Sequence, residues 1–385
     1  MEKIPILLIF LGHMWVDASQ GILPIALVKL KDVFALTYLQ VGIATSVLNF
    51  TSSMIQPFAG YIADRYRLGW FIPYGIIWTA ICMGLLGWAP SYPALLILVG
   101  FAGLGTAAFH PRAMMTVSLL SGARKGLGTA IFSTGGNLGF ALGPIVGSYL
   151  VLGLGLRATA GLIVPGVLIA LTILLYRKNI LGGEVSYPAS SGSRDKKDLL
   201  IPWLPLILVC FIVTLRSWVY MSFITYLPLF LKGQGVELKK ASLLLTVFLA
   251  GGAAAGLYGG HLSDRVGRKA VIIVSMLFYP IFTSLMIVSR EPWLWVLTAA
   301  SGASLLASFS VTIVLAQELM PRNLGLASGL ILGLGFGTGG LGVAASGWIA
   351  DQMGLYHMLW ILALVPVTAS LLAAFIKMPP RIAAR

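Results

Sequence analysis

A group of polar side chains interrupts the first apolar stretch of the chain. His13 and Asp17 are four residues apart, and Gln20 follows three residues later. On a helix these three positions share one face. An imidazole and a carboxylate held this closely can share a proton and release it. We therefore expect proton exchange on this face, carried by Asp17 and His13 together with His110 from a later apolar segment.

Arg112 and Arg216 are the two basic residues that fall inside apolar segments. A charge held at such depth costs at least about 2.5–3.5 kcal/mol on insertion scales, so both are candidate functional residues. Arg216 lies beside the position that matches Asp17 after a shift of 200 residues. We expect the two arginines to hold an anionic or strongly polar substrate. The substrate and Asp17 would compete for an arginine, and this competition would change the proton affinity of Asp17. The alternative is a fixed ion pair between Asp17 and one arginine.

Other side chains could line a central cavity because they are amides or amphipathic aromatics. The chain has no His-Glu-x-x-His pattern and no glycine elbow that carries a nucleophile, so no enzyme, metal site or cofactor is expected. The substrate-binding candidates besides the arginines are Gln20, Asn137, Trp218, Tyr220 and Gln317.

The composition says which elements must position these residues. Apolar residues make up 58% of the 385 residues and charged residues only 10%. A soluble domain carries roughly a quarter charged residues, so this chain cannot cover a normal water-facing surface. Segments inside lipid must satisfy their own backbone hydrogen bonds, which favours helices. The prediction is an all-α membrane protein.

Twelve apolar segments are long enough to cross a bilayer at about 20 residues each. A polar stretch rich in Gly, Ser and Lys separates two sets of six. This pattern predicts a bundle over 1–178, a cytoplasmic linker over 179–200 and a second bundle over 201–385. The twelve segments are 4–29, 39–62, 70–90, 93–118, 127–152, 158–177, 202–231, 240–262, 270–289, 293–316, 325–350 and 357–376.

The basic residues set the expected orientation. Alternating loops carry seventeen Lys and Arg on one side and seven on the other. Cytoplasmic loops collect such residues, so both termini and the linker are predicted to be cytoplasmic. This distribution also accounts for the net charge of +14, and no nucleic-acid partner is expected. The first apolar segment lacks a cleavage site and is predicted to be a retained helix.

The two halves repeat each other. Gly60 to Arg65 recurs as Gly260 to Arg265 at an offset of 200 residues, each run ending in Asp-Arg (Asp64 and Asp264). This repetition predicts two pseudo-symmetric six-helix bundles, an architecture found in transporters. The loop that continues through Gly267 and Arg268 resembles the signature loop of the major facilitator superfamily. The resemblance implies a gating role for both loops.

A second resemblance concerns the segment 127–152. Its residues Gly139, Gly143, Pro144 and Gly147 are similar to a glycine-proline motif of exporters and antiporters in that superfamily. Small residues allow helices to approach closely, and the proline removes one helical hydrogen bond. Tight helix packing explains the pattern as well as an antiport role does.

A closer resemblance covers most of the chain. Phe109-His110-Pro111, the run 135–139 and the run 316–322 look like the fosmidomycin-resistance branch of the superfamily. His13 and Asp17 fit the polar pair of that branch. The resemblance implies drug or metabolite export from the inner membrane, driven by proton exchange. Arg112 departs from it, because some members have an acidic residue there.

Together these patterns favour a secondary active transporter, specifically a proton-coupled antiporter that exports a small drug-like or anionic metabolite. The alternatives are proton-coupled uptake and a non-transporting receptor or scaffold. The expected partners are the substrate, protons and the lipid bilayer, and the chain is expected to be a monomer.

Overall fold

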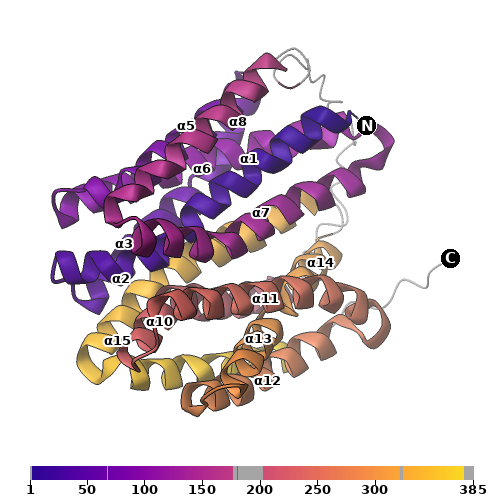
Figure 1. The fold of residues 1–385 in the computed structure, drawn as a ribbon. Helices are drawn as coiled ribbons and strands as arrows, with labels where there is room; N and C mark the ends of the chain where they lie inside the picture. Colours follow the sequence, from indigo (N-terminus) through magenta and orange to yellow (C-terminus); the bar gives the residue numbers. More distant parts are fainter. Residues whose placement is uncertain (1, 67, 177–179, 181–202, 321–323, 377–385) are drawn as a thin grey trace.

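The computed structural model describes residues 2–66, 68–176, 180, 203–320 and 324–376, and the regular elements in these ranges are all helical (Figure 1). The predicted linker over 179–200 lies outside the described residues, except for Ile180. The first half contains α1 (Lys3–Gly21), α2 (Leu23–Val33), α3 (Tyr38–Ser53), α4 (Gln56–Arg65), α5 (Phe71–Gly84), α6 (Tyr92–Leu120), α7 (Lys125–Ser148) and α8 (Ile163–Leu175). The second half contains α10 (Trp203–Gly233), α11 (Leu238–Val266), α12 (Arg268–Val288), α13 (Trp293–Leu306), α14 (Phe309–Leu319) and α15 (Leu324–Ala374).

Ten helical stretches in the described residues are long and apolar enough to cross a membrane. Their outer faces are apolar too, since Ile97, Leu168 and Leu257 are all more than half exposed. The ten count α15 once, although Gly354 has a non-helical φ of 82° within it. They omit the stretch 38–65, where α3 and α4 are separately too short. The chain is a multi-pass membrane protein, and the number of twelve crossings stays a prediction.

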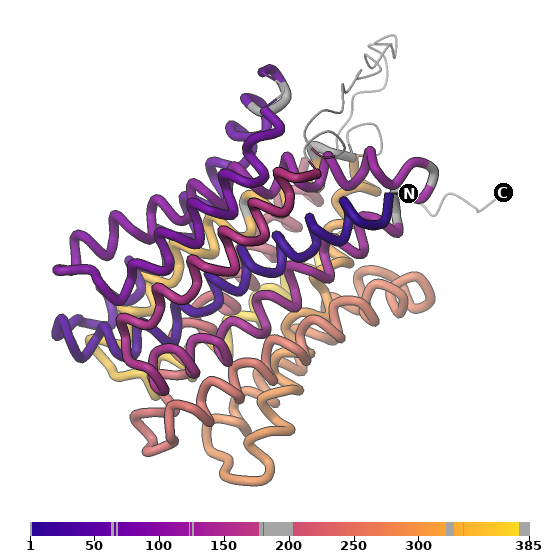
Figure 2. Tube along the Cα trace, turned by 45° about the horizontal axis from the view of Figure 1, so that its top comes forward, coloured from indigo at the N-terminus to yellow at the C-terminus, as the bar shows by residue number. Residues whose placement is uncertain are grey.

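The helices form two groups that follow the order of the sequence. Helices up to α8 lie together, and those from α10 onward form the second group (Figures 1 and 2). The groups meet where α3 packs against the first part of α15 and where α7 packs against α11. Each group contains one extensive contact between its first helix and a later helix. These contacts are α1 with α7 in the first group and α10 with α15 in the second.

Glycines allow α1 and α7 to approach each other. Gly135, Gly139, Gly143 and Gly147 recur every fourth residue and therefore form one face of α7. A Cβ atom on Gly139 would overlap the backbone of Met14, and one on Gly143 would meet the backbone of α1 at 2.6 Å. Pro144 lies inside α7 on this stretch. The α1–α7 contact therefore depends on the absence of side chains.

Contacts between the halves gather at the end of the molecule where α2 joins α3. The Asp351 carboxylate of α15 accepts hydrogen bonds from the backbone N–H groups of Tyr38 (2.7 Å) and Leu39 (2.8 Å). Those N–H groups begin α3, where a negative charge is favourable. Lys232 forms an ion pair with Asp32 at 2.6 Å. This end of the two bundles is held together by polar contacts.

The α1–α7 contact gives a first prediction. The variant Gly139→Ala forces a methyl group into the backbone of Met14 and should destabilise the fold by about 1–3 kcal/mol, which is typical of overpacking. We expect a lower Tm for the purified protein in detergent. The matched control is Gly333→Ala in α15, because a Cβ atom there has no neighbour within 4 Å. Equal Tm values for the two variants would contradict the packing argument.

Candidate functional site

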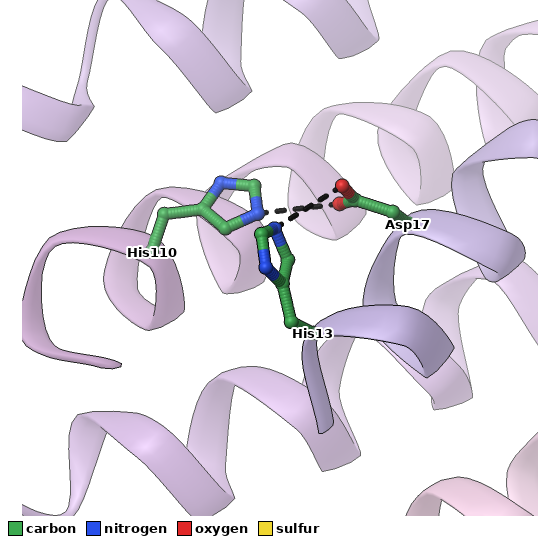
Figure 3. Close-up of side chains that lie close together, drawn as sticks. All are labelled: His13, Asp17 and His110. Atoms are coloured by element: carbon green, nitrogen blue, oxygen red, sulfur yellow. Dashed lines mark hydrogen bonds and ion pairs between the residues drawn. The ribbon is translucent and has the colours of Figure 1, made fainter. Parts of the chain in front are cut away.

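His13, Asp17 and His110 form one cluster (Figure 3). The Asp17 carboxylate lies 3.3 Å from His13 Nε2 through one oxygen and 3.2 Å from His110 Nε2 through the other. Gln20 Nε2 also donates to Asp17, at 3.3 Å. The three ionisable side chains are only 9–21% exposed. One carboxylate is thus bridged between two imidazoles in the interior of the first bundle.

The local sequence explains this geometry. His13 and Asp17 are one helical turn apart on α1, which places both on the face that packs against α7. Gly136 of α7 leaves the space that they occupy, because a Cβ there would lie 2.5 Å from His13 Nε2 and 2.7 Å from the Asp17 carboxylate. His110 approaches from α6, immediately before the helix-interior proline Pro111.

The hydrogen bonds of the cluster constrain its protons. His13 Nδ1 lies 2.7 Å from the backbone carbonyl of Phe132, which can only accept, so Nδ1 carries a hydrogen. A neutral His13 would then turn the lone pair of Nε2 toward the Asp17 carboxylate, a repulsive contact in a buried site. A proton on His13 or on Asp17 makes the contact attractive. The His13–Asp17 contact is therefore favourable when one of the two residues carries the additional proton.

The partner of His110 is an amide. Gln56 Nε2 lies 3.2 Å from His110 Nδ1. With the amide nitrogen donating, Nδ1 accepts, and His110 Nε2–H donates to Asp17. His110 can therefore satisfy one carboxylate oxygen while neutral.

The cluster lies on the wall of a cavity of about 530 Å³ between the two halves. Nearly all of its polar side chains come from the first half, and we call this set the polar wall. The second half contributes Tyr220 and otherwise only apolar side chains, which we call the apolar wall. The polar wall is His13, Asp17, Gln20, Asn49, Ser52, Ser53, Gln56, Thr106, His110, Ser133 and Asn137. The apolar wall is Met221, Leu249, Ala253, Leu306, Phe309, Ile313, Leu332 and Phe336.

The cavity unites six of the residues expected from the sequence and leaves out four. His13, Asp17, Gln20, His110, Asn137 and Tyr220 line it. Arg112, Arg216, Trp218 and Gln317 do not. Trp218 donates to Ser346 at 2.9 Å, and Gln317 donates to Ser328 at 2.8 Å. Arg112 is 4% exposed on α6.

Arg216 is 2% exposed and is turned toward α14. Its Nη1 donates to Thr312 at 3.0 Å and to Ser308 at 3.4 Å, and its guanidinium lies 5.2 Å from the centre of the Phe309 ring. Its described contacts include no carboxylate, so the fixed pair with Asp17 is not formed by Arg216. Instead the Arg216 guanidinium packs over the ring of Phe309, and the Phe309 side chain lines the cavity.

The predicted gating loops lie away from the cavity. Gly267 has a φ of 95° and is the N-cap residue directly before α12. Arg268 pairs with Asp264 of α11 and, at 3.2 Å, with Glu318 of α14, so these ion pairs stay inside the second half. Arg265 is exposed.

In the first-half loop, Arg65 donates to the Tyr61 hydroxyl at 2.9 Å. Gly60 faces Pro111 of α6, and Gly260 faces Ser310 of α14. The side chain of Asp64 lies outside the described part of the structure.

Sequence reasoning missed the apolar wall and the carbonyl of Phe132. Apolar residues are so common in this chain that composition could not single out Phe309 or Phe336. One signal existed for Phe309, because it matches Phe109, the neighbour of His110, after a shift of 200 residues. A backbone carbonyl leaves no trace in the sequence.

Comparison with known proteins places this geometry in a family. The model of the Major Facilitator Superfamily matches residues 9–241 and 235–385. The chain is 32% identical over 371 residues to the fosmidomycin resistance protein of Escherichia coli (strain K12), covering 94% of this chain and 90% of that protein. It is 31% identical, with the same coverage, to the uncharacterized MFS-type transporter YfnC of Bacillus subtilis (strain 168).

Solved structures agree on the fold. A bacterial homolog of the human lysosomal transporter Spinster, in an inward-facing and occupied conformation, has a TM-score of 0.81 at 16% identity and covers 96% of both chains. A D-xylose-proton symporter has a TM-score of 0.76 at 16% identity and covers 97% of both chains. The resemblance drawn from the sequence is thereby confirmed: this chain belongs to the major facilitator superfamily and is a transporter rather than an enzyme.

Proposed function

We propose that this transporter exports a small organic compound in exchange for protons. It would do so by alternating access between two six-helix bundles with twelve crossings, as a monomer in the inner membrane with both termini in the cytoplasm. Export, rather than the alternative of uptake, is favoured by the names of relatives. These are the fosmidomycin resistance protein at 32% identity and a multidrug resistance protein of Citrobacter koseri at 32% over 47% of this chain.

The observation that carries the proposal is the His13–Asp17 contact on the cavity wall. Because Phe132 fixes the hydrogen on His13 Nδ1, this contact is favourable only with a proton. Without that proton the carboxylate needs another partner that is positive or donates hydrogen bonds. A substrate group in the cavity can be that partner, because Asp17 and His13 both face the cavity.

Proton and substrate would therefore compete for the same carboxylate. Substrate bound from one side releases the proton, and a proton taken up from the other side displaces the substrate. A ligand shifts such an equilibrium only by its differential affinity for the two states. The shared carboxylate supplies that difference. In this scheme Asp17 carries the coupling, His13 holds the proton, and His110 with Gln20 keeps the carboxylate in place.

The arginines have a smaller role here than the sequence suggested. Neither Arg112 nor Arg216 lines the cavity in this conformation, and no substrate contact is assigned to them. Arg216 would instead hold Phe309 in position through its guanidinium. The substrate is accordingly not proposed to be an anion.

Alternating access requires that contacts between the halves can break. The Asp351 carboxylate bound to the start of α3 is suited to this, because two hydrogen bonds at one exposed site join the halves. The two ion pairs of Arg268 are internal to the second half and can stay intact while the halves rock. The motif loop of the second half would then stiffen that bundle.

The coupling role of Asp17 is tested with the variant Asp17→Asn in proteoliposomes. The amide can neither take up a proton nor offer the charge for which the substrate competes, so we expect substrate-dependent proton flux to be abolished and substrate binding to be weakened. The matched control is Glu237→Gln, an exposed acid at the start of α11, which should keep full coupling. Normal proton flux in Asp17→Asn would exclude Asp17 as the carrier.

The role of Asp351 is tested with the variant Asp351→Ala. Loss of a charged cap at a helix start costs about 1 kcal/mol, so the population should shift toward a state opened at this end. The measurement is the distance between spin labels at Val33→Cys and Gln352→Cys, with Cys82 and Cys210 replaced by serine. In Asp351→Ala we expect a larger fraction of molecules with the longer distance between the two spin labels.

The control for this experiment is Glu291→Ala, which removes an ion pair with Lys240 inside the second half alone. It should leave the distance distribution unchanged. Identical distributions for Asp351→Ala and the unaltered protein would mean that this contact does not hold the closed end.

A further inference from the structure

The two sides of the cavity differ in chemistry. Eleven side chains of the polar wall can form hydrogen bonds, whereas the apolar wall offers none, and Tyr220 is the one hydroxyl of the second half among the described lining residues. A compound bound between the halves therefore finds its hydrogen-bonding groups almost entirely on the first half, which also contributes Pro111, Met114, Phe132 and Phe140, and meets hydrocarbon on the second half. This division predicts an amphipathic compound whose head and body face opposite halves.

The apolar wall is shaped for a ring or a short alkyl body. Phe309 and Phe336 lie with ring centres 6.0 Å apart at an angle of 57°. Leu249 of α11 and Ile313 of α14 extend the same surface. Apolar surface removed from water on both partners is the main source of affinity in such a pocket.

The charge of the head follows from the polar wall. Asp17 is its one acidic residue, and the described residues that line the cavity include no lysine or arginine. An anionic head would be repelled by the Asp17 carboxylate, and the two basic side chains on the wall, His13 and His110, are already in contact with that carboxylate. A cationic head would be attracted by Asp17 and by the faces of aromatic rings such as Tyr220 and Phe140.

From this arrangement we infer that the substrate is a small amphipathic amine. Its ammonium head lies at Asp17, and its apolar body lies against Phe309 and Phe336. The inference rests on the proposed function of the same cavity, and it narrows the substrate to one charge class. It also reverses the expectation, drawn from the two arginines, of an anionic substrate.

The test compares three probes that share one body and differ in the head: phenylbutylamine, phenylbutanol and phenylbutyrate. Binding to the purified full-length protein in detergent is measured by calorimetry at neutral pH without a gradient. We expect the amine to bind at least about tenfold more tightly than the carboxylate, a difference of about 1.4 kcal/mol, with the alcohol between them. Equal or tighter binding of phenylbutyrate overturns the inference, as does the absence of binding by all three.

The body position is tested with Phe336→Ala. Loss of the ring should weaken binding of the amine and the alcohol by a similar factor, about tenfold or more, because both share the phenylbutyl group. The matched control is Phe211→Ala on the outer face of α10, where the ring is 57% exposed and removal should change nothing. Equal affinities in the two variants would overturn the placement of the body.

These outcomes can be separated from those of the coupling experiment. If the amine binds preferentially but Asp17→Asn still couples protons, the proposal that Asp17 exchanges protons is wrong and the proposal of an amine substrate holds. If Asp17→Asn uncouples transport but phenylbutyrate binds best, the substrate class fails and the exchange stands.

Discussion

Asp17 is a carboxylate held inside a bundle whose outer surface is built for lipid, and it cannot be left without a positive or hydrogen-bonding partner. Burying an unpaired charge costs several kcal/mol, so the surroundings must supply two imidazoles and an amide. His13 satisfies it only when a proton is present, because the Phe132 carbonyl fixes the other ring nitrogen. This one constraint makes the site both stable and dependent on protonation.

The packing of α1 against α7 makes the contact between His13 and Asp17 possible. Glycines at every fourth position of α7 bring α1 close, and the additional glycine Gly136 leaves room for the imidazole of His13 and the carboxylate of Asp17. Gly139 and Gly143 then fix the helices against each other on the same face. Small residues are useful here because lipid provides no hydrophobic force to pull helices together, and close backbone packing has to replace it.

The repeat is symmetric in fold and asymmetric in chemistry. Residues 200 positions after His13 and Asp17 are Val213 and Ser217, so the second half has no imidazole and no carboxylate at the matching positions. Arg112 and Arg216 are not equivalent either, because the shifted partner of Arg112 is Thr312, which accepts a hydrogen bond from Arg216. The repeat gives two groups of helices with corresponding contacts, α1 with α7 and α10 with α15. Divergence then gave the polar wall to one bundle and the apolar wall to the other.

The sequence by itself determined the membrane class, the two halves and the pairing of His13 with Asp17. These depend on composition, on a long repeat and on the spacing of one helical turn, all of which are local or statistical. The sequence grouped His110 with Asp17, but only the tertiary structure decided that His110 Nε2 contacts the Asp17 carboxylate, that Arg216 turns to α14 and that Phe309 and Phe336 face the cavity. Each of these depends on how helices far apart in the chain rotate about their axes. In a chain that is apolar nearly everywhere, the weak periodicity of a helix does not reveal that rotation, and only contacts between helices fix it.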